Sequence, residues 1–200
     1  MPENQPSPWN VANLVTMARI ALVPVFAWTL LVDGGESVGW RLAATGVFAV
    51  AALSDRLDGH LARTRGLVTD LGKLLDPIAD KALVGAALVL LWWPLGELPW
   101  WVPAVILVRE LAITAMRMAV LRYAVMPASR GGKIKTVLQT VAITLFVLPL
   151  DHLPGAVRVT AWVVMVAAIV VTVVTGLDYA LQGWRLRRAA RAGETSASTA

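Results

Sequence analysis

The 200-residue sequence has no cysteine, only two histidines, and only 16% charged residues. The absence of cysteine excludes disulfide bonds, thiolate metal ligands and cysteine nucleophiles. Histidine is not expected as a general base, since His152 is predicted at the end remote from the acidic residues discussed below. What the chain has instead is 58% hydrophobic residues and a mean hydropathy of +0.67. This composition predicts an integral membrane protein.

The hydrophobic residues gather in blocks that are separated by short connections containing glycine or proline. Most blocks are long enough to cross a bilayer, and several of the nine tryptophans lie near block ends, as at membrane interfaces. The fifth block is short, so it is expected to extend at its cytoplasmic end or to lie with little tilt. The sequence predicts an all-α bundle of six transmembrane helices with a polar cavity facing the cytoplasm, the spans being residues 11–32, 38–61, 69–92, 100–123, 135–150 and 156–181.

One domain is expected, with short polar ends. Residues 1–10 form a polar N-terminal segment with no signal peptide, residues 11–183 form the transmembrane domain, and residues 184–200 form a basic, disordered tail. No internal repeat is visible.

Lysine and arginine are distributed unequally between the two sides of the predicted bundle. One side carries only Arg41 and Arg158, whereas basic residues flank the second and fourth connections and follow the last block. By the positive-inside rule, both termini and the acidic residues then face the cytoplasm of a multi-pass cell-membrane protein. The pI of about 10.2 is explained by this topology and by contact with anionic lipid, and nucleic-acid binding is not expected.

Four aspartates stand at helical spacing in the second and third blocks. Asp55 and Asp58 are three residues apart, and Asp76 and Asp80 are four apart, so each pair lies on one face of its helix. If the two helices are neighbours, the carboxylates converge, and oxygen ligands of this kind suit Mg²⁺ or Mn²⁺. The alternative is a set of structural ion pairs with the nearby basic residues Arg63, Arg65 and Lys73.

A fixed spacing joins these aspartates to other residues in the pattern Asp55-x2-Asp58-Gly59-x2-Ala62-Arg63-x8-Gly72-x3-Asp76-x3-Asp80. The pattern resembles the complete signature of the CDP-alcohol phosphotransferases, with no position missing. The resemblance covers roughly residues 10–182 and implies a six-helix bundle, usually a homodimer, that displaces CMP from a CDP-linked lipid with an alcohol. Further residues resemble the bacterial phosphatidylglycerophosphate synthases of that family, namely Asn13-x2-Thr16-x2-Arg19, Leu75-Asp76-Pro77-x-Ala79-Asp80-Lys81, Arg109-Glu110 and Gly132-Lys133-Ile134-Lys135-Thr136.

The resemblance assigns roles to the signature residues. The four aspartates would hold two metal ions, Mg²⁺ or Mn²⁺, between the protein and the donor's diphosphate, and Asp80 would also act as the general base. Gly59 leaves room for close approach of the cytidine or the opposite helix, and Arg63 can form paired hydrogen bonds to a phosphate. The residues expected to bind CDP-diacylglycerol are Asn13, Thr16, Arg19, Gly59, Arg63 and Thr69.

A phosphorylated acceptor needs cations that the aspartates do not occupy. Arg109 lies deep in the fourth block, where an arginine is costly without an anion. Lys133 and Lys135 follow two glycines that allow close backbone approach to a phosphate, although the positive-inside bias alone would also place lysines there. The residues expected to bind the acceptor phosphate are Arg109, Arg117, Lys133 and Lys135.

The leading prediction is transfer of the phosphatidyl group from CDP-diacylglycerol to sn-glycerol 3-phosphate, giving phosphatidylglycerophosphate and CMP. Two alternatives keep the family and change the acceptor, to phosphatidylglycerol in a cardiolipin synthase or to inositol phosphate. A small membrane transporter is a third alternative, because transporters also use carboxylates within the membrane. Such a fold is expected to show an inverted repeat with broken helices, which this sequence lacks.

Overall fold

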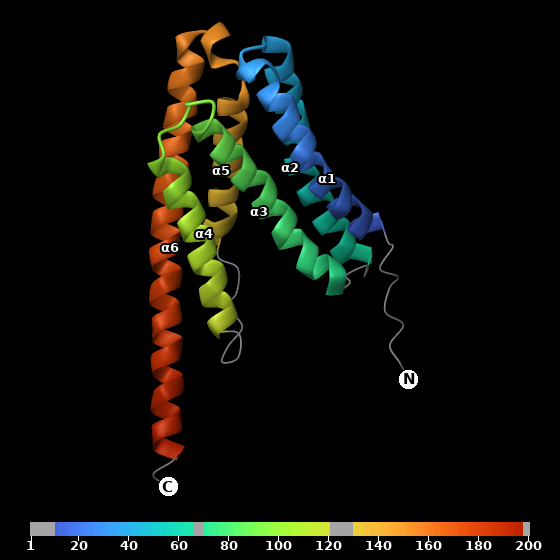
Figure 1. The fold of residues 1–200 in the computed structure, drawn as a ribbon. Helices are drawn as coiled ribbons and strands as arrows, with labels where there is room; N and C mark the ends of the chain where they lie inside the picture. The colour runs from blue at the N-terminus through green and yellow to red at the C-terminus, as the bar shows by residue number, and fades with distance from the viewer. Residues whose placement is uncertain (1–10, 66–69, 121–129, 198–200) are drawn as a thin grey trace.

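The computed structural model describes the backbone of residues 11–65, 70–120 and 130–197, which contain α-helices and no strands (Figure 1). Two short 3-10 segments, η1 (Val32–Gly35) and η2 (Leu150–His152), follow the first and fifth helices. The side chains described are those of residues 13–54, 75, 78–79, 81–116, 118 and 131–184. In this part of the chain the helices are α1 (Val11–Leu31), α2 (Val38–Arg65), α3 (Asp70–Trp92), α4 (Trp101–Val120), α5 (Arg130–Val147) and α6 (Gly155–Ala197).

The observed helices coincide with the predicted blocks, and the largest differences in their bounds are at the end of α2, the start of α5 and the end of α6. Helix α5 begins at Arg130, so it extends at the end where the sequence left room for extension. Helix α6 continues to Ala197, beyond residue 184, where the sequence predicts the start of a disordered tail. This stretch can continue the helix because it is rich in alanine and arginine, which are strong helix formers even where a segment is not hydrophobic.

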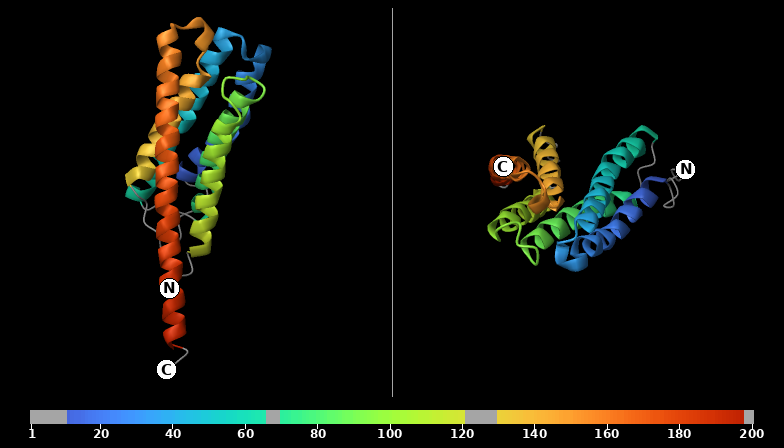
Figure 2. Two further views of the ribbon diagram at one scale, coloured as in Figure 1. Left: turned by 90° about the vertical axis from the view of Figure 1, so that its left-hand side faces the viewer. Right: turned by 90° about the horizontal axis from the view of Figure 1, so that it is seen from above.

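The helices form two arms that meet at one end and separate at the other. Helix α1 packs against α2 and α3 in the first arm, and α6 packs against α4 and α5 in the second. Figures 1 and 2 show the arms joined at the top and spread at the bottom, with α3 and α5 in contact between them. Successive helices run in opposite directions, so the C-terminal end of α2 and the N-terminal ends of α1, α3 and α5 lie at the open end.

The hydrophobic core fills the joined end. Large side chains from both arms are fully buried there, and the rings of Phe26 and Phe48 pack with their centroids 5.5 Å apart. Where lipid surrounds the helices, such contacts stabilise mainly through close van der Waals packing, because lipid is as apolar as these side chains. Aliphatic residues from the other helices complete this core, among them Leu83, Leu88, Ile106, Ile143 and Met165.

A buried arginine links α2 to the end of α5. Arg41 is 5% exposed, and its guanidinium donates to the carbonyl oxygens of Phe146, Val147 and Leu148 at 3.0–3.1 Å. These carbonyls lie at the C-terminal end of α5, where helix carbonyls lack intrahelical partners and the helix dipole favours a cation. Arg41 therefore holds α2 and α5 together at the joined end, on the side where the sequence has few basic residues.

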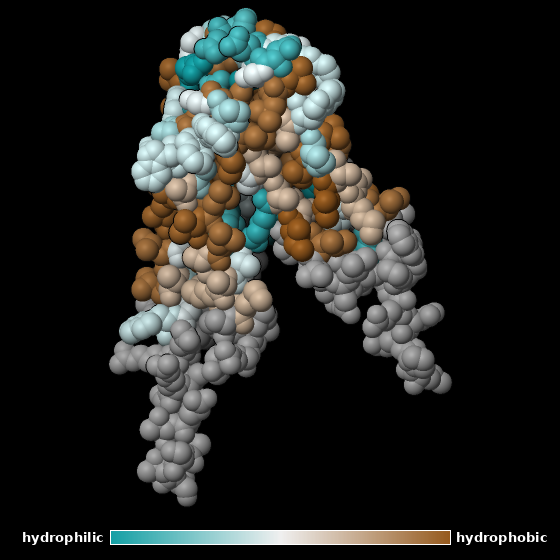
Figure 3. All heavy atoms as spheres, viewed as in Figure 1, coloured by the Kyte–Doolittle hydropathy of each residue, from teal (hydrophilic) through white to brown (hydrophobic). Residues whose placement is uncertain are grey.

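The outer faces of both arms are apolar. Exposed leucines and valines contribute to the brown surface of both arms in Figure 3, and several tryptophans are exposed as well. Two stretches in the described part of the chain are long and apolar enough to cross a membrane, Asn13–Gly35 and Gly155–Trp184. Only 28% of the apolar part of the first stretch and 22% of that of the second are buried. Most of this apolar surface therefore lacks a protein partner in the described structure and suits lipid.

Candidate active site

The residues of the carboxylate signature lie on two antiparallel helices, at the open end of the molecule. The last three turns of α2 carry Asp55, Asp58 and Arg63, and the first three turns of α3 carry Asp76 and Asp80. Both segments are helical, so the three- and four-residue spacings put each pair on one face. Gly59 lies on the same stretch of α2. The side chains of these five residues lie outside the described part of the structure, and so does Thr69.

The start of α1 brings buried polar side chains to this same end. Asn13, Thr16 and Arg19 are only 1–2% exposed, although the rest of α1 is almost entirely apolar. Their spacing of three residues places them on one face, and the contacts of α1 with α2 and α3 explain why that face is buried. Each of the three has a polar or electrostatic partner. The structure therefore brings the first-helix motif to the helices that carry the signature.

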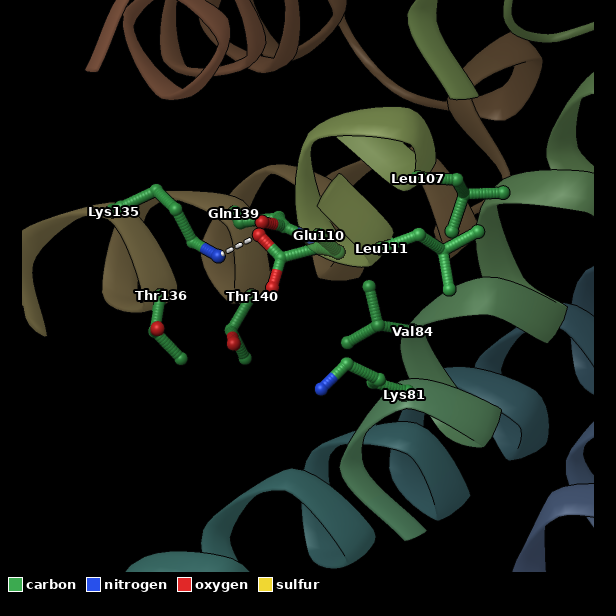
Figure 4. A pocket seen from close by; sticks show the side chains of 9 residues that line it. All are labelled: Lys81, Val84, Leu107, Glu110, Leu111, Lys135, Thr136, Gln139 and Thr140. Atoms are coloured by element: carbon green, nitrogen blue, oxygen red, sulfur yellow. Dashed lines mark hydrogen bonds and ion pairs between the residues drawn. The ribbon is translucent and has the colours of Figure 1, made fainter. Parts of the chain in front are cut away.

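A cavity of about 170 Å³ opens beside the signature, between the two arms. A water molecule needs about 10–15 Å³ in a cavity, so this one has room for a small polar molecule. Lys81, which directly follows Asp80, belongs to the wall that α3 contributes to the cavity. Figure 4 shows the ammonium of Lys81 directed from α3 toward this space. The hollow between the arms, with hydrophilic side chains in it, is visible in Figure 3. The lining residues are Lys81, Val84, Leu107, Glu110, Leu111, Lys135, Thr136, Gln139 and Thr140.

The charged residues of the cavity wall include an ion pair between α4 and α5. The ammonium of Lys135 contacts Oε1 of Glu110, and Nη1 of Arg109 donates to the same oxygen at 3.0 Å. Lys135 is 6% exposed, so its charge is largely removed from solvent. With Lys81 on the opposite wall, the described side chains supply more positive than negative charge. This excess positive charge suits an anionic ligand.

Arg109 itself points away from the cavity, toward α6. Its Nε donates to the carbonyl of Thr172 at 3.3 Å, and its Nη2 donates to Oγ1 of Thr175 at 2.9 Å. The guanidinium also lies 6.0 Å from the ring centroid of Tyr179, within range of a cation–π interaction. Arg109 is not among the residues that line the cavity. The structure thus separates Arg109 from Lys135 by the carboxylate of Glu110.

Neither of the other two predicted acceptor residues is among the described residues that line the cavity. Lys133 lies in the first turn of α5, is exposed, and does not line the cavity. Arg117 belongs to α4, but its side chain lies outside the described residues.

The sequence reasoning assigned no role to several residues that line the cavity. On α5, Lys135 and Gln139 are four residues apart, as are Thr136 and Thr140, so these polar side chains form a stripe on one side of the helix. Oε1 of Gln139 is buried without a hydrogen-bond partner in the described structure. The four-residue spacing was the signal that could have found this stripe.

Comparisons with known proteins agree on the family. A sequence profile of the CDP-alcohol phosphatidyltransferases matches residues 9–174. A protein of Mycobacterium tuberculosis named probable phosphatidylglycerophosphate synthase is 51% identical over 176 residues, which make up 88% of this chain and 82% of that protein. The CDP-diacylglycerol–glycerol-3-phosphate 3-phosphatidyltransferase of Bacillus subtilis is 38% identical over 191 residues, 88% of this chain and 96% of that one. Among solved structures, the apo form of a phosphatidylinositol phosphate synthase from Mycobacterium tuberculosis matches with a TM-score of 0.53 and 25% identity, covering 84% of this chain and 86% of the other. The chain therefore belongs to the CDP-alcohol phosphatidyltransferase family, as its carboxylate signature predicted.

Proposed function

We propose that this protein transfers the phosphatidyl group from CDP-diacylglycerol to sn-glycerol 3-phosphate and releases CMP. The observation that carries the proposal is the positively charged cavity that begins at Lys81, one residue beyond Asp80. A small anionic acceptor in that cavity would lie next to the signature that defines the family's reaction. The names of the relatives at 51% and 38% identity support the same acceptor.

The four aspartates of the signature are proposed to hold two divalent metal ions, Mg²⁺ or Mn²⁺. Their chemistry fits such ions, since all four offer carboxylate oxygens, the ligands that hard cations prefer. Ions bound there would offset the charge of the donor's diphosphate and of the departing CMP. The residues in question are Asp55, Asp58, Asp76 and Asp80.

The donor lipid is proposed to bind along α1, α2 and the start of α3. Arg63 would form paired hydrogen bonds to a phosphate, and Gly59 would leave space for the cytidine. The buried polar face of α1, with Asn13, Thr16 and Arg19, supports a role in holding the donor or the helices around it. Thr69 is proposed to contribute a hydroxyl contact.

The acceptor is proposed to bind with its phosphate near Lys135 and its hydroxyl near Asp80. The carboxylate of Asp80 would accept the proton of the attacking hydroxyl. A bond forms between that oxygen and the lipid-side phosphorus, and the bond from this phosphorus to the oxygen of CMP breaks. Lys133 and Arg117, at the same end of the molecule, are proposed to attract the phosphate. Arg109 was predicted to bind it directly, but its contacts with α6 support an indirect role.

A second acceptor is supported by one observation. The solved structure that this chain resembles is a phosphatidylinositol phosphate synthase, so an inositol phosphate is the alternative. Phosphatidylglycerol is a weaker alternative, because the cavity of about 170 Å³ suits a small polar molecule better than a second lipid. A transporter is not supported, since the family is one of transferases.

The setting proposed for this reaction is the cell membrane, crossed by all six helices, with both termini and the site in the cytoplasm. The apolar outer faces of the arms support a lipid surrounding, and the basic residues near the open end support its cytoplasmic position beside anionic lipid. A homodimer is proposed from the family resemblance.

The test is an acceptor competition with purified protein. CDP-diacylglycerol in mixed micelles is offered together with equal amounts of glycerol 3-phosphate, inositol phosphate and phosphatidylglycerol, and the lipid products are identified by mass spectrometry. Phosphatidylglycerophosphate is expected as the main product, with CMP released in equal amount. A main product made from either of the other acceptors would reject the proposal, as would the absence of any CMP release.

A further inference from the structure

The guanidinium of Arg109 connects helix α4 to helix α6. Each of its three nitrogens has a protein partner, with Nε on the carbonyl of Thr172, Nη2 on the hydroxyl of Thr175, and Nη1 on Glu110. Two of these contacts anchor the group on α6, and the third reaches back to the neighbouring residue on α4. The side chain of Arg109 is 13% exposed. An arginine bound in this way is held as part of the helix packing.

Glu110 extends this connection to Lys135. The Arg109 and Lys135 contacts both fall on Oε1, while Figure 4 shows the other carboxylate oxygen directed away from Lys135. The Lys135 side chain is only 8% exposed, although a lysine ordinarily keeps its ammonium in water. A continuous series of contacts thus runs from α6 through Arg109 and Glu110 to the ammonium on the cavity wall.

We propose that Glu110 and Arg109 are positioning residues, which fix the Lys135 ammonium where the acceptor phosphate binds. This inference rests on the proposed function, because it takes Lys135 as the phosphate ligand. An ammonium has three hydrogens, and Glu110 accepts one of them, which leaves two for a phosphate. A lysine that is held before binding loses less conformational entropy when the ligand arrives. Arg109 then acts through Glu110 and does not touch the acceptor.

The opposite possibility is that Glu110 competes with the phosphate for Lys135. The two readings predict changes of opposite sign when the carboxylate is replaced by an amide of the same shape. Loss of a competitor would lower the KM for the acceptor, whereas loss of a positioning group would raise it. The anchoring of Arg109 on α6 favours positioning, because it holds the carboxylate of Glu110 beside Lys135.

Gly176 offers a way to disturb this series without changing any charge. A Cβ at this position would lie 3.1 Å from Cγ and 3.4 Å from Nε of Arg109, so an alanine would force the arginine to shift. Gly46, in the middle of α2, is the matched control, because a Cβ there meets nothing within 4 Å. Both substitutions place alanine inside a helix, so their difference reports the contact with Arg109.

The kinetic test compares Glu110→Gln, Gly176→Ala and Gly46→Ala in the purified protein. Glu110→Gln is expected to raise the KM for the acceptor about ten- to a hundredfold, the usual effect of losing a hydrogen bond to a charged group. Gly176→Ala is expected to raise it about three- to tenfold, because overpacking displaces the side chains beside it. The KM for CDP-diacylglycerol should stay unchanged in both, and Gly46→Ala should match wild type. An unchanged or lower acceptor KM in Glu110→Gln would overturn the proposal.

A second measurement does not depend on turnover or on the identity of the acceptor. An amine-reactive reagent is applied to the protein in micelles, and the labelling rates of Lys135 and Lys133 are read by mass spectrometry, with the exposed Lys133 as internal reference. Lys135 should be labelled slowly in wild type and at least about threefold faster in Glu110→Gln and Gly176→Ala. An unchanged labelling rate of Lys135 in both variants would overturn the proposal that Glu110 and Arg109 position Lys135. If wild type makes no phosphatidylglycerophosphate while the labelling changes as expected, the proposed function fails and the positioning of Lys135 stands.

Discussion

Arg41 and Glu97 form a buried ion pair at the end where the two arms of the molecule join. Nη2 of Arg41 lies 2.8 Å from Oε1 of Glu97, and the two side chains are 6% and 8% exposed. The same arginine binds the last carbonyls of α5, so one side chain connects α2, α5 and the connection between α3 and α4. This end is remote from the signature, and its contacts therefore bear on stability.

Replacing Arg41 by methionine is expected to destabilise the protein strongly. Among the described side chains, the change leaves the carboxylate of Glu97 with the 3.5 Å contact to Arg158 alone, and it removes the partner of the α5 carbonyls. Breaking a buried ion pair on one side costs about 3 kcal/mol or more, which corresponds to a Tm lower by roughly 6–12 °C. Thermal unfolding in detergent measures the shift.

Arg158→Met is the control, because that side chain is 39% exposed and an exposed pair contributes about 1 kcal/mol at most. Equal shifts in the two variants would contradict the role given to Arg41.

The helices were largely predictable because hydrophobic blocks determine where a chain can form them in lipid. The differences between predicted and observed bounds fell at helix ends that are polar. Helix α5 starts at Arg130 and α6 continues to Ala197, and hydropathy cannot tell a polar helical turn from a loop. Helix propensity carries that information instead, since alanine and arginine favour a helix whether or not they are buried.

The family was predictable because the carboxylate pattern resembles a known family signature, but the direction of each side chain was not predictable. Lys135 was predicted at the site and lines the cavity, whereas Arg109 was predicted there and turns to α6. Sequence spacing places a residue on a helix face, and it does not say which neighbouring helix that face meets. The position of Arg109 is coupled to Gly176, more than sixty residues away, because a Cβ there would lie only 3.1 Å from Cγ of the arginine. No local pattern contains such a long-range relationship.

The proposed metal site at the four aspartates predicts that activity depends on a divalent metal ion. EDTA is expected to abolish turnover, and Mg²⁺ or Mn²⁺ should restore it. Substitution of any one of the four aspartates by asparagine should leave the protein folded but inactive, because each change removes a charged ligand. In Asp80→Asn the loss should fall mainly on kcat, as expected for the group that accepts the proton. CMP release and thermal unfolding measure the two properties.

An acidic residue outside the signature provides the control for this series. Asp178 is exposed on α6, where its carboxylate accepts a hydrogen bond from Gln182 at 2.9 Å. Asp178→Asn should keep wild-type activity and the same response to metal. Near-normal turnover of Asp80→Asn at saturating Mg²⁺ would remove its assignment as the base.

The basic residues at the open end predict the orientation of the protein in the membrane. A reporter fused after Ala200 should be active in the cytoplasm, and one inserted at Gly96 should be active outside. Gly96 suits an insertion because it is exposed in the connection between α3 and α4, and a Cβ added there would meet nothing within 4 Å. An external C-terminus would place the signature on the side of the membrane opposite to the one proposed.

The two lysines at the start of α5 are expected to differ in their effect on the acceptor. Lys135 is buried on the cavity wall, whereas Lys133 is exposed and outside it, so only the first is in place to hold a phosphate. Lys135→Ala should raise the KM for glycerol 3-phosphate about ten- to a hundredfold, because a charged hydrogen bond to the phosphate is worth about 1.5–3 kcal/mol. Lys133→Ala should raise it by a factor of about two to three, and the difference from wild type should disappear at high salt, since a solvent-exposed charge acts through a screened field. The KM for CDP-diacylglycerol should be unchanged in both variants. Equal effects of the two substitutions, or equal use of unphosphorylated glycerol by wild type, would reject the cavity as the phosphate site.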